Sequence, residues 1–153
     1  MKILIFGLPG SGKTTFAKKL IEGKKIPHFN ADEIRKLFED WDFTEDGRRR
    51  QANRMMTMCD LAVNHVVIDF VCPFESYRSF YDLKIWMNTI DKGRFEDTNK
   101  VFEKPKKVDF EIKEFSTTGS ILIFPSIFFH AVKPITKGIR KSVALWGFGP
   151  QWK

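Results

Sequence analysis

The segment that most constrains the fold is a glycine-rich loop near the start of the 153-residue chain. Residues 7–14 read GLPGSGKT and satisfy the pattern G-x-x-x-x-G-K-[ST]. An apolar run at residues 3–6 precedes the loop, and apolar residues at helical spacing follow it as far as Gly23. A strand, such a loop and a helix in this order are typical of a phosphate-binding loop, whereas a chance glycine loop would lack this context. The residues predicted to bind phosphates are Gly7, Leu8, Pro9, Gly10, Ser11, Gly12, Lys13, Thr14 and Thr15.

The residue types of the loop suit a nucleoside triphosphate. Glycines let backbone N–H groups turn towards phosphates, and the N-terminus of the following helix adds partial positive charge. Lys13 is expected to reach the β- and γ-phosphates and to act in catalysis, while the Thr14 hydroxyl is expected to bind Mg²⁺. The loop therefore predicts ATP as phosphoryl donor together with Mg²⁺.

Strand and helix patterns alternate along the chain as far as residue 115. Strands are predicted at residues 3–6, 26–29, 65–71, 83–89 and 108–115, helices at 13–22, 34–38 and 48–64, and an irregular charged segment at 91–107. This alternation favours an α/β fold, the three-layer P-loop NTPase core with a parallel sheet. Beyond Gly119 the pattern changes to three short apolar segments without helices, which predict a small antiparallel β appendage at residues 121–124, 128–132 and 143–148.

The charge also changes near residue 115. The formal net charge is +7, yet all 19 acidic residues lie at or before Glu114 and five of the 26 basic residues follow it. The first 114 residues therefore carry 21 basic and 19 acidic side chains, and the excess of positive charge belongs mainly to the tail. We predict two units, a P-loop domain at 1–115 and a β-rich tail at 116–153, and we do not expect nucleic acid as a partner.

Cysteine content and hydropathy bear on the compartment. Cys59 and Cys72 are too few for a disulfide framework. No apolar run approaches the roughly 18–20 residues needed to cross a membrane, and the first residues lack a small-residue cleavage site. We predict a cytoplasmic protein with reduced thiols and no membrane partner.

Four motifs resemble the adenylylsulfate kinase family over roughly residues 1–112. They read GLPGSGKTT from residue 7, NADEIR from 30, DFTEDGRRRQANR from 42 and DFVCP from 69. The resemblance implies an ATP-dependent kinase of sulfate assimilation that phosphorylates the 3′-hydroxyl of adenosine 5′-phosphosulfate. Asn30 stands where the family has the first aspartate of an Asp-Gly-Asp-Asn-x-Arg motif, whereas Asp32 and Arg35 keep the family's residue types.

Three of these positions carry predicted chemistry near the phosphates. A carboxylate at the end of a strand, here Asp32, can accept the proton of the acceptor hydroxyl, and Arg35, one helical turn later, can bind the acceptor's anionic group. The alternatives are a helix N-cap for Asp32 and a solvated helix position for Arg35. Asp69 ends the third predicted strand, where burial without a partner is costly, and is predicted to assist Thr14 at Mg²⁺. Cys72 is predicted to be a buried structural thiol.

The resemblance also implies an acceptor site for a small nucleotide. Phe43 and Phe95 would form two faces of an aromatic clamp on adenine, with Arg48 and Arg54 as further substrate-binding residues; ordinary packing and a solvated helix face are the alternatives. Gln51 and Asn53 stand where the family has asparagine and arginine. Lys92 and Arg94 are candidate cations of a mobile lid, or members of a merely basic loop.

The tail resembles another family. The segment GSILIFPSIFFHAVKPITKGIRKSVALWGFGP is similar to the closing strands of a 2-oxoglutarate/Fe(II) oxygenase of the prolyl-hydroxylase type, with His130 and Arg140 at the positions of an iron ligand and a 2-oxoglutarate ligand, followed by Ser142. The upstream His-x-Asp/Glu motif of a facial triad is missing from the sequence. His130 and Arg140 are therefore interpreted as vestigial positions in a β appendage or fusion remnant.

The sequence predicts an ATP- and Mg²⁺-dependent kinase acting on a small nucleotide. A nucleotide-binding protein without turnover, and a polynucleotide or other nucleotide kinase, remain the alternatives.

Overall fold

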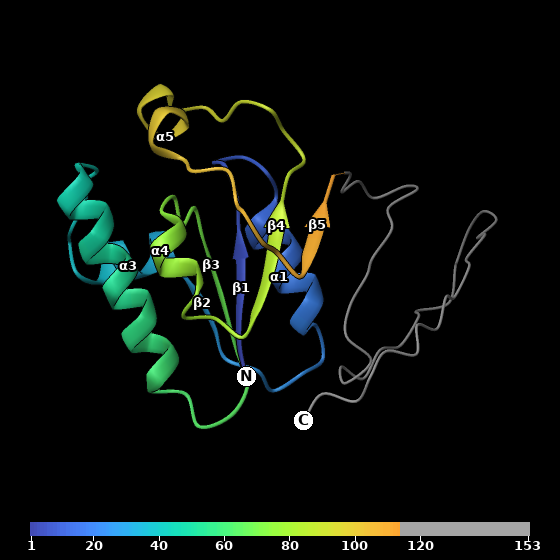
Figure 1. Cartoon of the computed structure of the whole chain (residues 1–153). Helices are drawn as coiled ribbons and strands as arrows, with labels where there is room; N and C mark the ends of the chain where they lie inside the picture. Colours follow the sequence, from blue (N-terminus) through green and yellow to red (C-terminus); the bar gives the residue numbers. More distant parts are fainter. Residues whose placement is uncertain (114–153) are drawn as a thin grey trace, which may run out of the picture. The chain divides into compact units, whose positions relative to one another are not determined.

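The sheet was traced in a computed structural model of the chain, which describes residues 1–113. Five strands form one parallel sheet in the order β2-β3-β1-β4-β5 (Figure 1). The connection from β1 runs towards one edge and the connection from β3 runs towards the other, so the chain reverses direction between these two central strands. Ligand sites of open α/β sheets lie at the carboxyl ends of strands at such a point. The strands are β1 (Lys2–Phe6), β2 (His28–Asn30), β3 (Val66–Phe70), β4 (Leu83–Met87) and β5 (Phe110–Ile112).

Five helices accompany the sheet in the described part of the chain: α1 (Lys13–Ile21), α2 (Ala31–Leu37), α3 (Glu45–Asp60), α4 (Glu75–Arg78) and α5 (Glu96–Val101). Successive strand residues point to opposite faces of a sheet. Leu4 and Phe6 of β1 pack in one buried cluster with Met55 of α3. The alternate residues face the other way, where the Asp69 side chain meets Thr14 of α1. The sheet is thus covered on both faces, as the predicted three-layer core requires.

The predicted strands within residues 1–113 and the parallel sheet are confirmed, whereas several helix predictions need correction. Helix α2 begins at Ala31 rather than 34 because the Asn30 side chain caps it, accepting from the backbone N–H groups of Asp32 and Glu33. Helix α3 begins at Glu45 rather than 48 because Thr44 caps it through the N–H of Gly47.

The two short helices α4 and α5 were not predicted, and α5 lies inside the segment that was predicted to be irregular. Its sequence, EDTNKV, has no apolar stripe, and Thr98 is its buried residue. Helix α4 places the Arg78 side chain, 1% exposed, against the backbone carbonyls of Cys72, Pro73 and Glu103. Neither helix is built on hydrophobic periodicity, which is why the sequence pattern did not reveal them.

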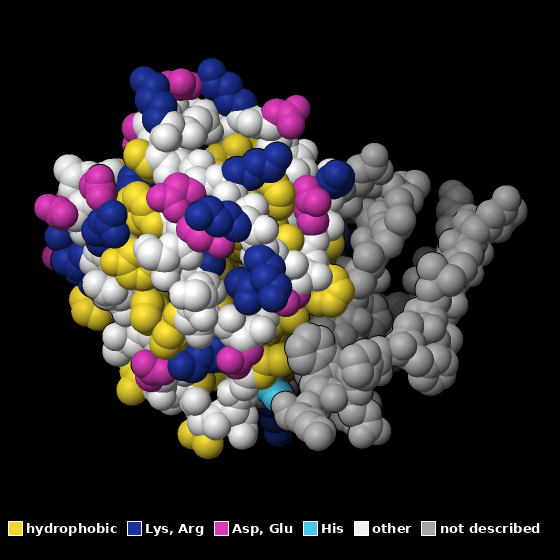
Figure 2. Space-filling view, in the orientation of Figure 1, with side chains coloured by type: hydrophobic (Ala, Val, Ile, Leu, Met, Phe, Trp, Pro, Cys, Tyr) yellow, Lys and Arg dark blue, Asp and Glu magenta, His cyan; other side chains and the backbone are white. Residues whose placement is uncertain are grey.

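Within the described residues, basic and acidic side chains are interspersed on the face drawn in Figure 2, and the two cysteines form no disulfide. Cys59 and Cys72 are free and buried, and burial raises the pKa of each thiol to about 12. Within residues 1–113 no helix is long and apolar enough to span a membrane.

The predictions for the tail lie outside the described residues. These are the boundary near Phe115, the strands at 121–124, 128–132 and 143–148, and the positions of His130, Arg140 and Ser142.

Candidate active site

The loop between β1 and α1 has the backbone of a phosphate cradle. Gly7, Gly10 and Gly12 have φ values of 147°, 94° and 87°, a region in which side chains are strained. A Cβ atom on Gly7 would lie 2.5 Å from the carbonyl oxygen of Met87. The loop can therefore pass this close to β4 only with glycine at position 7. Helix α1 has no side-chain cap, and the buried Ser11 hydroxyl has no hydrogen-bond partner among the described residues. These unpartnered donors fit a phosphate chain.

Lys13 lies in the same cradle. Its Nζ donates a hydrogen bond of 2.9 Å to the carbonyl of Leu8. Burial lowers the pKa of Lys13 to about 8, although the carboxylates of Asp69 and Asp32 act in the opposite direction. A bound phosphate would place negative charge beside this buried amine and favour its protonated form.

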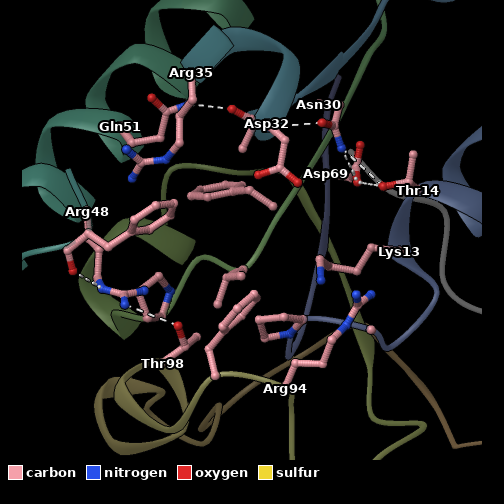
Figure 3. Close-up of a pocket in the computed structure, with 18 of the residues that line it drawn as sticks. Lys13, Thr14, Asn30, Asp32, Arg35, Arg48, Gln51, Asp69, Arg94 and Thr98 are labelled. Carbon is pink, nitrogen blue, oxygen red and sulfur yellow. Dashed lines mark hydrogen bonds between the residues drawn. The ribbon is translucent and has the colours of Figure 1, made fainter. Parts of the chain in front are cut away.

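Asp69 is fully buried and has three hydrogen-bonding partners, of which Figure 3 shows Thr14 and Asn30. Thr14 Oγ1 donates to Asp69 Oδ2 at 2.7 Å, and Asn30 Nδ2 donates to the same oxygen at 3.0 Å. His28 Nε2 lies 2.5 Å from Oδ1. Thr14 gives its proton to Asp69, and its hydroxyl oxygen accepts a hydrogen bond of 3.1 Å from Asn30 Nδ2, which leaves one lone pair of that oxygen for a cation. This arrangement fits the predicted Thr14–Asp69 site for Mg²⁺, which prefers oxygen ligands.

A pocket of about 760 Å³ opens beside these residues at the carboxyl ends of β1 and β3. Its walls come from the phosphate loop, from the segment that joins α2 to α3, and from the segment that contains α5. Of the predicted site residues, the structure brings together the following: Pro9, Gly10, Gly12, Lys13, Thr14, Thr15, Asp32, Arg35, Phe43, Arg48, Asp69, Arg94 and Phe95.

Three carboxylates line this pocket, and they differ in their partners. Asp69 is held by the donors described above, and Asp97 pairs with Arg48. The Asp32 carboxylate points into the pocket (Figure 3) and has no hydrogen-bond or ion-pair partner among residues 1–113. Asn30, which stands in place of an aspartate, uses its amide to cap α2 and to reach Asp69. Asp32 is therefore the pocket carboxylate free to accept a proton.

Arg35 and Arg48 are buried, with much of their hydrogen-bonding capacity already used. Arg35 donates to the carbonyls of Asp40 and Asp42 at 2.9 Å each, and burial lowers the pKa of its guanidinium. Arg48 donates to the Phe43 carbonyl through Nε and to Asp97 and Thr98 through Nη2. Both arginines line the pocket, yet each also holds the segment that carries Phe43.

Arg54 and Lys92 do not line the pocket. Arg54 Nη1 pairs with Asp40 at 2.7 Å, so its guanidinium contacts the α2–α3 segment rather than the pocket. Lys92 pairs with Glu96 at 3.0 Å. Arg94 does line the pocket: Figure 3 shows it directed towards Lys13, and its Nε would lie 3.9 Å from a Cβ on Gly10.

Several residues of the site were not predicted from the sequence. Trp41 lines the pocket with a 54% exposed side chain, and its ring centroid lies 6.4 Å from that of Phe43. An exposed tryptophan next to a predicted clamp residue was the signal available for it. His28, Asp97 and Thr98 gave no comparable signal because their partners are distant in sequence.

Three features define a nucleotide-binding kinase of the P-loop class: the phosphate loop between β1 and α1, the hydrogen bond from Thr14 of α1 to buried Asp69 of β3, and the parallel five-stranded sheet. The chain belongs to the adenylylsulphate kinase family, whose sequence profile matches residues 1–89. A search among curated proteins finds no match.

Solved kinase structures share the fold. The APS kinase of Mycobacterium tuberculosis gives a TM-score of 0.53 at 19% identity, with 72% of this chain and 84% of that chain covered. A shikimate kinase of Acinetobacter baumannii in complex with shikimate gives 0.55 at 18% identity, covering 75% and 84%. A gluconokinase of Sinorhizobium meliloti gives 0.53 at 18% identity, covering 72% and 81%. At these identities the likeness establishes the fold alone.

Proposed function

We propose that the protein transfers the γ-phosphoryl group of ATP, with Mg²⁺, to the 3′-hydroxyl of adenosine 5′-phosphosulfate or a related small nucleotide. The observation that carries the proposal is the shared pocket: the phosphate loop, the Thr14–Asp69 pair and the unpartnered Asp32 carboxylate all line it. The family membership of residues 1–89 supports the same conclusion. We propose the P-loop domain at 1–115 as the catalytic unit and the cytoplasm as its location, the latter supported by two free buried thiols.

The loop and its cations would act on the donor. The N–H groups at the start of α1, together with Lys13, would hold the β- and γ-phosphates, and Arg94 is placed to add positive charge from the opposite wall. Thr14 would bind Mg²⁺ directly, with Asp69 holding the hydroxyl proton of Thr14. Bound Mg²⁺ neutralises charge on the phosphoryl oxygens.

Asp32 would act on the acceptor. The acceptor hydroxyl oxygen forms a bond to the γ-phosphorus, the bond from that phosphorus to the β–γ bridging oxygen breaks, and the hydroxyl proton passes to the Asp32 carboxylate. ADP leaves with the bridging oxygen. A general base needs a carboxylate that no other side chain holds by a hydrogen bond or an ion pair. Among the described residues, the Asp32 carboxylate has no such partner.

The aromatic side chains favour a nucleotide over a small acid. Trp41, Phe43 and Phe95 line the pocket and are each about half exposed. Exposed rings at a pocket offer a stacking surface to a planar base, and such stacking is worth about 1–3 kcal/mol per base. Gluconate and shikimate have no aromatic ring to stack there.

A panel of acceptors tests the proposal. ADP release from ATP and Mg²⁺ would be measured with adenosine 5′-phosphosulfate, gluconate, shikimate and an oligonucleotide with a free 5′-hydroxyl, with Lys13→Ala as the inactive control. We expect turnover with adenosine 5′-phosphosulfate and a product phosphorylated at the 3′-position, identified by mass spectrometry and ³¹P NMR. Turnover with the oligonucleotide instead would replace this acceptor by a polynucleotide, and turnover with none would overturn the kinase assignment.

A further inference from the structure

We propose that His28 is a positioning residue that fixes the Asp69 carboxylate at the Mg²⁺ site. The inference rests on the proposed function, in which Thr14 and Asp69 serve that ion. None of the sequence motifs includes His28, so its place beside Asp69 is seen in the structure alone.

The register of β2 and β3 explains why His28 reaches Asp69. His28 pairs with Val67 and Asn30 pairs with Asp69 in the parallel ladder. Residues two apart on a strand share a face, so His28 and Asn30 lie on the same face as Asp69. His28 is therefore the diagonal neighbour of Asp69, at a separation that a long side chain can span.

The two carboxylate oxygens of Asp69 are held differently. Oδ2 accepts from both Thr14 and Asn30, at 2.7 and 3.0 Å. Oδ1 has His28 as its hydrogen-bonding partner among the described residues, with Nε2 at 2.5 Å. Because an ionised carboxylate can only accept, the His28 nitrogen that faces it must carry a proton. Without His28 the carboxylate keeps the donors on one oxygen alone, and its plane is free to turn.

His28 is mostly buried and lies outside the pocket lining, so its role does not involve contact with substrate. The His28 side chain is 10% exposed and that of Asp69 is 1% exposed, so water does not readily replace the imidazole. His28 is not among the residues that line the pocket. Any effect of His28 on the metal must therefore pass through Asp69, and partners of this kind change metal affinity about 10–100-fold when they are removed.

Two amide substitutions distinguish the hydrogen bond from the bulk of the side chain. In His28→Gln the amide nitrogen lies about as far along the side chain as Nε2 and can still donate to Asp69. In His28→Asn the amide nitrogen corresponds to Nδ1, which is too short to reach Oδ1. His28→Phe keeps the volume of the ring and has no donor. Exposed His65, changed to Asn, is the matched surface control.

The measurement is the affinity of the full-length protein for ADP carrying a fluorescent N-methylanthraniloyl group, with Mg²⁺ and with EDTA. We expect H28N and H28F to lower the Mg²⁺-dependent gain in affinity tenfold or more, while H28Q and H65N stay within threefold of the wild type. Affinity in EDTA should be the same for all five proteins, because the phosphate contacts come from the loop and Lys13.

If H28N and H28F keep the wild-type gain, or lose affinity in EDTA to the same extent, His28 does not position Asp69 and the inference is wrong. If the wild type itself gains nothing from Mg²⁺, the proposed metal site fails first and the inference fails with it. If H28Q restores the gain that H28N loses, the hydrogen bond to Oδ1 is the cause.

Discussion

Arg48 of α3 and Asp97 of α5 form an ion pair that joins two walls of the pocket, with Nη2 and Oδ2 2.5 Å apart. The two ends of the pair differ in burial: the Arg48 side chain is 7% exposed and that of Asp97 is 62% exposed. The same guanidinium donates to the Phe43 carbonyl and to the Thr98 hydroxyl. Arg48 therefore links the segment that carries Phe43 to the segment that carries Phe95.

The burial difference predicts unequal effects of removing either partner. Arg48→Ala should lower the free energy of unfolding by about 1–3 kcal/mol, because it leaves the buried Thr98 hydroxyl without its donor. Asp97→Ala should change it by less than about 1 kcal/mol, because the Asp97 carboxylate is 62% exposed and screened by water, and Arg48 keeps its bonds to Phe43 and Thr98. Urea unfolding of both variants measures this, and equal losses would contradict the linking role of Arg48.

Trp41 provides a test of the acceptor wall. Under the proposed function, Trp41→Ala should raise the KM for the nucleotide acceptor about tenfold while leaving the KM for ATP unchanged, because the ring lines the pocket and would stack on the acceptor base. Phe38→Ala is the matched control, since Phe38 is exposed to a similar extent and does not line the pocket. Steady-state kinetics measure both constants, and a similar rise in the Phe38 variant would show a general effect on the α2–α3 segment.

The lowered pKa of Lys13 predicts a pH dependence of nucleotide binding. Its pKa of about 8 in the ligand-free protein means that the amine is largely neutral above this pH. A bound phosphate favours the charged form, so binding takes up a proton between pH 8 and the ordinary pKa of lysine, about 10.4. Affinity for ADP should therefore fall as pH rises above 8, by at most about tenfold per pH unit.

Calorimetry in buffers with different ionisation enthalpies measures this proton uptake. The Lys13→Met variant should bind more weakly and should show a smaller uptake at pH 9. A wild type and variant with the same uptake would mean that another group titrates on binding.

How far the sequence could predict the site depends on how local the signal is. The phosphate loop was predictable because its glycines, lysine and threonine are contiguous between a strand and a helix. Asp69 was predictable because a carboxylate after three β-branched residues needs partners when buried. His28 was not, since its contact with Asp69 depends on the pairing of β2 with β3 across 41 residues.

Arg54 illustrates a different limit. The resemblance placed it beside Arg48 at the acceptor, whereas the structure turns it towards Asp40. Arg50 and Arg54 are one helical turn apart on α3 and both pair with that carboxylate. Residues four apart share a helix face, so the spacing contained the information, but the face that points to the pocket is decided by the packing of α3 on the sheet.

Asp32 carries the sharpest prediction about chemistry. If it accepts the hydroxyl proton, Asp32→Asn should lower kcat by about 10²–10⁴-fold, the usual contribution of a general base. Affinity for ADP and Mg²⁺ should stay within a few-fold of the wild type, because the phosphate contacts belong to the loop and Thr14.

The matched control is Glu33→Gln, the next residue on α2, which is also exposed and does not line the pocket. Single-turnover measurements separate the chemical step from product release. An Asp32→Asn variant with normal single-turnover rates would exclude this carboxylate as the base. Since Asp69 and Asp97 are already engaged by Thr14 and Arg48, that result would leave proton transfer to solvent or to an oxygen of the transferred phosphoryl group as the routes in this pocket.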